Sequence, residues 1–101
     1  MKIAQIWEWD MPKDRDRLKA LEDWSSKTQA YLAEVNEKYN RTRTSWSQGD
    51  NHMILIIEFA DADDYAKFMK DDEAQMWVFD FCRTVDNVTV RTCRPAISRP
   101  E

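Results

Sequence analysis

Stretches of alternating side chains and two helical patterns follow one another along this 101-residue chain. Residues 2–9 alternate in the manner of a β-strand, whose successive side chains point to opposite faces. One face of this predicted strand carries Ile3, Gln5, Trp7 and Trp9. From about Asp14 to Tyr39, apolar residues then recur at spacings of three and four, which predicts a long amphipathic helix.

Residues 41–48 and 51–59 are predicted to form a hairpin, because the turn sequence QGDN between them holds the only glycine of the chain. A two-residue turn at Gly49 and Asp50 pairs Trp46 with Met53 and makes Arg41 and Glu58 a cross-strand ion pair. This register places Trp46, Leu55 and Ile57 on the face of Phe59. A three-residue turn would shift the pairing by one residue.

The second half of the chain repeats the order of helix and strand. Asp61 is a predicted N-cap for a helix that carries Tyr65, Phe68 and Met69 inward. Asp72 and Gln75 are interpreted as a capping box that restarts the helix, and Trp77 and Phe81 lie on its apolar side. Residues 87–94 alternate as a last strand, and residues 95–101 form a tail with two prolines.

The element order β-α-β-β-α-β predicts an α+β, ferredoxin-like domain over residues 1–94, with a four-stranded antiparallel sheet and the helices on one face. The other face holds Ala4, Ile6, Ile54 and Ile56, and this chain supplies no third layer for it. Apolar residues make up 43% of the sequence, which is much for so small a core. We therefore expect a homodimer packed sheet to sheet.

Charge and hydropathy exclude several classes of protein. The net charge is −4 and no basic patch stands out, so neither nucleic acid nor an anionic membrane is an expected partner. The apolar run MILII is too short to cross a bilayer, and an acid at residue 8 interrupts any signal-peptide pattern. We expect a soluble, cytoplasmic protein in which Cys82 and Cys93 are reduced thiols.

The segment LIIEFADADDYAKFMKDDEAQMWVFDF contains a strand that ends in an acid and an aromatic residue, a D-x-D-D-aromatic helix start and a DDEAQMW restart. In these features and in its element order the chain resembles the dimeric α/β-barrel superfamily, which includes antibiotic-biosynthesis and haem-degrading monooxygenases and NIPSNAP-like small proteins. The resemblance implies a ligand pocket inside each subunit, between sheet and helices, with Phe59 facing it.

Aromatic side chains dominate the residues predicted to face this pocket. The alternative is that they simply fill a solid core. The predicted substrate-binding residues are Trp7, Trp9, Trp46, Leu55, Phe59, Phe68, Trp77, Phe81 and Arg94. Gln5 and Tyr65 are the catalytic candidates: an amide donor for a developing oxyanion and a hydroxyl that donates a proton. Their alternatives are a satisfied buried amide and a core-edge tyrosine, and Arg94 could equally form an ion pair in a dimer.

No cofactor is predicted. The haem-degrading relatives have a histidine ligand on the second helix, where this chain has Trp77 and Val78. His52 is the only histidine, and it is expected on the face away from the pocket, toward solvent or a dimer partner. Neither a metal site nor a phosphate-binding loop can be recognised in the sequence.

Two functions remain compatible with the sequence. The first is a cofactor-independent enzyme of the monooxygenase, cyclase or isomerase type, which acts on an aromatic or polyketide-like substrate in the pocket. The second is a non-catalytic ligand-binding or accessory dimer of the same fold.

Overall fold

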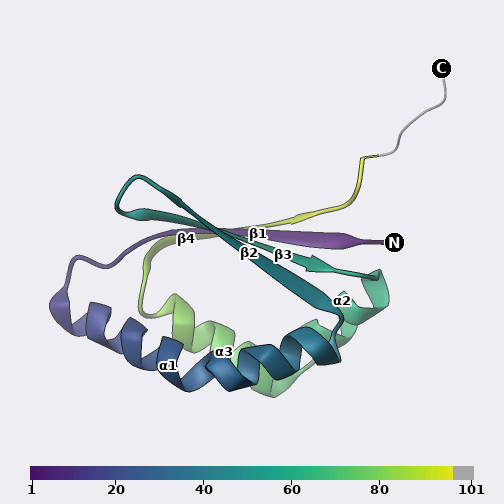
Figure 1. Cartoon of the computed structure of the whole chain (residues 1–101), viewed down its shortest axis with the longest axis horizontal. Coiled ribbons are helices and arrows are strands. Elements are labelled where there is room, and N and C mark those ends of the chain that lie inside the picture. The colour runs from purple at the N-terminus through teal and green to yellow at the C-terminus, as the bar shows by residue number, and fades with distance from the viewer. Residues whose placement is uncertain (97–101) are drawn as a thin grey trace.

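The computed structural model describes residues 1–96, which form one antiparallel sheet and three helices (Figure 1). The elements are β1 (Ile3–Asp10), α1 (Arg15–Lys38), β2 (Arg41–Gln48), β3 (His52–Phe59), α2 (Ala62–Met69), α3 (Asp72–Cys82) and β4 (Asp86–Cys93). The strand order in the sheet is β2-β3-β1-β4. The predicted ferredoxin-like α+β fold is therefore confirmed, with the second helix divided into α2 and α3.

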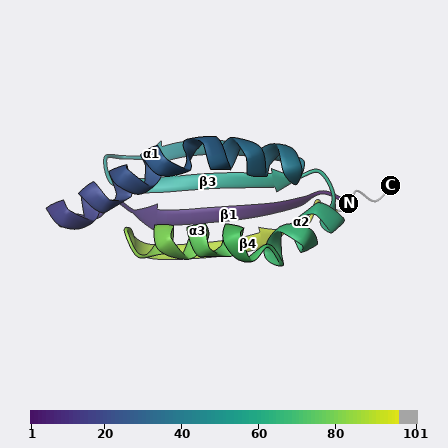
Figure 2. The ribbon, with the colours of Figure 1, turned by 90° about the horizontal axis from the view of Figure 1, so that it is seen from below.

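All three helices lie on one face of the sheet. Figure 1 shows the sheet as the upper layer and the helices as the lower layer. From below, α1 runs along the side of β2 and β3, and α3 runs along the side of β4 (Figure 2). We call the face toward the helices the inner face and the opposite one the outer face.

Acidic N-caps start each helix. Asp61 caps α2, as predicted, and Asp14 caps α1, because each carboxylate accepts a hydrogen bond from a free backbone N–H. The predicted capping box at Asp72 and Gln75 is wrong. Asp71 caps α3 by accepting from the backbone N–H of Ala74, and the amide of Gln75 instead donates to the Phe68 carbonyl.

The β2–β3 hairpin has a three-residue turn, so the predicted register is wrong by one residue. Gln48 pairs with His52, and Gly49 in the turn adopts a φ of 67°, which glycine reaches without strain. Trp46 therefore pairs with Ile54, and Arg41 pairs with Phe59. A shift of one residue exchanges the two faces of a strand.

The exchange reverses two predicted placements. Arg41 lies on the inner face, and the predicted ion pair with Glu58 does not form; Lys2 binds Glu58 instead, at 3.3 Å. Trp46 lies on the outer face, where 60% of its surface is exposed.

The main core lies between the inner face and the helices. Its buried members come from α1 and the residue after it, from β3, and from α2 and α3: Val35, Tyr39, Leu55, Ile57, Phe59, Phe68 and Ala74. Phe59 is completely buried, because Tyr65 and Phe68 of α2 both pack against its ring.

The outer face combines half-buried aliphatic residues with a charged cluster. Ile6 pairs with Ile56, and Ile54 lies beside Glu8 at the hairpin end. His52 bridges two carboxylates there, with Nε2 2.9 Å from Glu8 Oε1 and Nδ1 2.8 Å from Asp10 Oδ1. As predicted, His52 points away from the helices. Among residues 1–96, no helix covers this face.

None of the helices within residues 1–96 is long and apolar enough to cross a membrane. Cys82 and Cys93 are both half-buried free thiols.

Candidate ligand-binding cavity

A cavity of about 590 Å³ lies between the inner face of the sheet and the three helices. Its lining comes from β1, β2 and β3 above and from α1, α2 and α3 below, together with Met11 after β1. This volume suits a small organic molecule, since typical ligand pockets measure roughly 300–1,000 Å³. The predicted pocket side of the sheet is thus hollow over part of its length rather than filled throughout.

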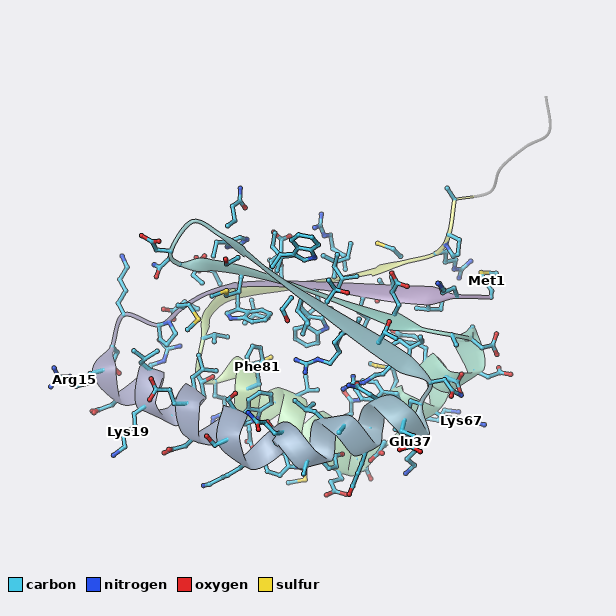
Figure 3. All side chains as sticks on the ribbon, viewed as in Figure 1. Met1, Arg15, Lys19, Glu37, Lys67 and Phe81 are labelled. Carbon is cyan, nitrogen blue, oxygen red and sulfur yellow. The ribbon has the colours of Figure 1, made fainter. Side chains whose placement is uncertain are left out.

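Aromatic rings form much of the cavity wall. Trp7 and Trp9 project from the same face of β1 because they are two residues apart on a strand. Phe81 rises from α3 into the space under the sheet (Figure 3), with its ring centroid 4.9 Å from that of Trp9. On the opposite helix, Tyr31 packs against Trp77 at 5.7 Å.

Two arginines of β2 add positive charge to this apolar wall. Arg41 and Arg43 both line the cavity because they share the inner face in the observed register. Only 6% of Arg41 is exposed, whereas Arg43 is more open to solvent. Burial, reinforced by the neighbouring charge of Arg43, lowers the pKa of Arg41 to about 10. Its guanidinium therefore remains charged at neutral pH, in surroundings that disfavour the charge.

The guanidinium of Arg41 is held in place by two contacts. Its Nε donates a 2.7 Å hydrogen bond to Oδ1 of Asn36, which lies in the last turns of α1. Its Cζ lies 4.9 Å from the centroid of the Phe68 ring, a cation–π distance. Both contacts leave the two Nη groups available.

Tyr31 is a proton donor in the lining. Burial and then the negative charges of Asp71 and Glu73 raise the pKa of its hydroxyl to about 12. The hydroxyl therefore stays protonated at neutral pH and can donate a hydrogen bond to an oxygen of a ligand.

The cavity brings together seven of the eleven predicted site residues. The residues of that set that line it are Trp7, Trp9, Trp46, Leu55, Phe68, Trp77 and Phe81. Trp46 does so from the edge strand β2, although it is exposed and lies on the outer face by its pairing with Ile54.

The catalytic candidates are not among the lining residues. Gln5 is buried on the inner face, where its Oε1 accepts a 3.5 Å hydrogen bond from the Trp7 indole. It therefore contacts the cavity wall through Trp7 and does not line the cavity itself. Tyr65 packs edge-on against Phe59 at 5.4 Å in the core. Arg94 is exposed, one residue beyond the end of β4. Phe59, predicted to face the pocket, is likewise absent from the lining because it is completely buried in the core. The catalytic and binding roles proposed for Gln5, Tyr65, Phe59 and Arg94 stay predictions.

Arg41, Arg43 and Tyr31 line the cavity but were not predicted from the sequence to do so. The three-residue alternative for the hairpin turn contained the signal for both arginines, because it places them on the Phe59 face. Tyr31 belongs to the apolar pattern of α1, and such a pattern indicates burial but does not show that a cavity lies beside it.

Within residues 1–96, no three histidine, cysteine or acidic side chains come close enough together to hold a metal ion.

Comparison with known proteins finds similarity in structure alone. No protein-family model matches the sequence, and no curated protein matches it. The solved structure of SnoaB, a cofactor-independent oxygenase from Streptomyces nogalater, is similar with a TM-score of 0.64 and 12% identity over 99% of this chain and 98% of that one.

Two further structures show the same arrangement. Rv0793 from Mycobacterium tuberculosis has a TM-score of 0.68 and 13% identity, covering 99% of this chain and 100% of that one. A NIPSNAP family protein from Agrobacterium tumefaciens has a TM-score of 0.59 and 10% identity, over 95% and 94% of the two chains. The resemblance read from the sequence is confirmed at the level of the fold: the chain has the ferredoxin-like fold that antibiotic-biosynthesis-monooxygenase-like and NIPSNAP-family proteins share.

Proposed function

We propose that this protein is a cofactor-independent enzyme of the monooxygenase, cyclase or isomerase type, acting on a planar aromatic or polyketide-like substrate. The observation that carries the proposal is the cavity of about 590 Å³ walled by Trp7, Trp9, Trp77 and Phe81. Indole and phenyl rings offer flat apolar surfaces that suit a fused-ring ligand. The fold that the chain shares with a cofactor-independent oxygenase adds support.

The chemistry required of the protein in such a reaction is modest. In an oxygenation without a cofactor, an acidic CH₂ of the substrate reacts with O₂ to give C=O and water, and the substrate itself supplies the electrons. The protein binds the rings, excludes water and stabilises the enolate oxygen that forms when the carbon loses its proton. Donors in the cavity lining that suit this last task are the Tyr31 hydroxyl and the Arg41 guanidinium.

The active form we propose is a homodimer that packs through the outer face. Ile6, Ile54 and Ile56 are only partly buried within one chain, and 60% of Trp46 is exposed beside them. A second copy packed sheet to sheet removes this apolar surface from water.

A non-catalytic ligand-binding dimer is the second candidate. The position of Gln5 and Tyr65 favours it, because neither catalytic candidate lines the cavity. Turnover therefore decides between the two functions, and ligand binding alone does not.

A hydroxyanthrone tests both, since it is planar and carries an acidic CH₂. If the compound binds, it should quench tryptophan fluorescence saturably. If the protein is an enzyme, then in air and in buffer with a chelator one O₂ should be consumed for each quinone formed. Trp77→Ala should weaken binding about 10-fold or more by removing an aromatic wall. Phe79→Ala is the matched control, because Phe79 lies on the same helix and is 64% exposed.

Each outcome of this experiment has a distinct meaning. Binding with turnover supports the enzyme, and binding without turnover of any anthrone, naphthol or polyketide probe supports the accessory function. Equal binding by Trp77→Ala and the parent protein contradicts the cavity as the site.

A further inference from the structure

The cations of this protein differ in whether an acid neutralises them. Arg17 binds Asp86 at 2.6 Å, and Arg91 binds Glu8 at 2.8 Å, both at the protein surface. Within residues 1–96, neither Arg41 nor Arg43 has a carboxylate within ion-pair distance, although Arg41 is the more buried of the two.

Arg41 lines the cavity, and its Nη groups have no partner among residues 1–96. Asn36 occupies only Nε, and no other hydrogen bond to the guanidinium forms among residues 1–96. In the same part of the chain, no side-chain nitrogen is both fully enclosed and without a partner. The unbonded Nη atoms are therefore accessible, and the space that Arg41 lines is the cavity.

Such an arrangement is unfavourable in the empty protein. Removing a guanidinium from water without a counter-charge costs free energy, and Arg43 adds repulsion from the same strand. The only carboxylate among the lining residues is that of Glu22, on an exposed position of α1, and it pairs with neither arginine. An anion inside the cavity would supply the missing charge.

We propose that the cavity takes an aromatic carboxylate, with the two carboxylate oxygens on the Nη groups of Arg41 and the rings along the wall of Trp77 and Phe81. The proposal rests on the proposed function to the extent that the same cavity holds the ligand. A guanidinium presents parallel N–H groups that match a carboxylate in a bidentate pair. Asn36 and Phe68 hold the guanidinium of Arg41 in place before the ligand binds, and Arg43 adds a second positive charge.

The test compares 2-naphthoate with 2-naphthamide, which has the same shape and no charge. Calorimetric titration at neutral pH should show that the parent protein binds the carboxylate about 10-fold or more tightly than the amide. In Arg41→Met this preference should fall to near one, and in Arg41→Lys part of it should return. Arg91→Met, on the outer face, is the matched control and should keep the full preference.

The outcomes separate this proposal from the proposed function. If both probes bind equally in the parent protein, the carboxylate proposal is overturned and the aromatic cavity stands. If neither probe nor any hydroxyanthrone binds, both fall. Should Arg41→Met fail to fold, Arg43→Met and Arg41→Lys carry the comparison: an unchanged preference in both contradicts the role of the β2 arginines.

Discussion

The two faces of the sheet handle charge in opposite ways. On the outer face, Glu8 lies between His52 and Arg91, and Asp10 accepts hydrogen bonds from His52 and Asn87. On the inner face, Arg41 is almost completely buried, and it contacts an amide oxygen and an aromatic ring but no carboxylate among residues 1–96. The charges on the outer face are neutralised by other side chains of the chain, whereas the charge of Arg41 on the inner face is not.

This difference shows where the chain depends on something outside itself. A neutralised cluster such as that around His52 needs no ligand to complete it. An enclosed cation beside a cavity would be neutralised by a ligand of opposite charge, which is why we propose that ligands bind on the inner face. The outer face lacks an apolar surface to pack against, because its aliphatic residues and Trp46 remain partly in water.

The largest effect on stability is expected in the main core, at the end of β3 on the inner face. Phe59→Ala removes a completely buried ring and should lower the free energy of unfolding by about 3–5 kcal/mol, measured by urea denaturation. Ile56→Ala, three positions earlier and on the outer face, is only half-buried and should cost less. Equal costs would contradict the assignment of the core to the inner face.

The proposed dimer predicts a large effect on association. Ile56→Lys places an unpaired charge at the centre of the outer face, and a two-fold interface contains it twice. Association should weaken on the order of 100-fold, measured by light scattering across a dilution series. Met76→Lys is the control, because Met76 is 68% exposed on α3. A parent protein that is monomeric at all concentrations contradicts the dimer.

A smaller effect, of opposite sign, is expected at Arg41. Arg41→Met exchanges an enclosed, unneutralised cation for a shorter, unbranched apolar side chain, and should raise the free energy of unfolding by about 1 kcal/mol. Arg91→Met removes a surface ion pair and should change it by about 0.5 kcal/mol or less. A loss of stability in Arg41→Met would show that the contacts with Asn36 and Phe68 outweigh the cost of the buried charge.

How far the sequence predicts this molecule depends on the strand. In β1, large apolar residues alternate with smaller or charged ones, so the inner position of Trp7 and Trp9 followed directly from a period of two. The long stripe of α1 likewise gave that helix nearly to the residue. Each of these segments has one mainly apolar face, which is stable only when it is buried.

In contrast, β2 reads RTRTSWSQ and has no apolar face. Its only large apolar residue, Trp46, was predicted on the face of Phe59 but lies on the outer face. The register of such a strand is decided by the length of the turn at Gly49 and not by periodicity. Arg41 was therefore assigned to a surface ion pair. The sequence predicted the aromatic wall of the cavity and missed its charge, since the register of one polar strand determines that charge.

The smallest predicted effect is the pH dependence of the His52 cluster. Hydrogen bonds with Glu8 and then Asp10 raise the pKa of His52 above its usual value of 6.5. Its contribution to stability is therefore fully present below pH 6.5 and is lost as the pH rises through the higher pKa of the folded state. The pKa values of Glu8 and Asp10 are lowered, Glu8 chiefly by His52 and Asp10 chiefly by Asn87, so their contributions are lost as the pH falls through those lowered values.

The cluster should therefore stabilise the fold most between the ordinary pKa of Glu8, 4.5, and that of His52, 6.5. The melting temperature of the parent protein should exceed that of His52→Gln by more at about pH 5.5 than at about pH 9. Arg91→Met keeps the bridge between His52 and both carboxylates, so it should retain most of this pH dependence. A difference between the parent and His52→Gln that stays constant or grows toward high pH would contradict the bridge. The outer face would then not be neutralised through His52, and its contrast with the arginines of the inner face would rest on Arg91 and Glu8 alone.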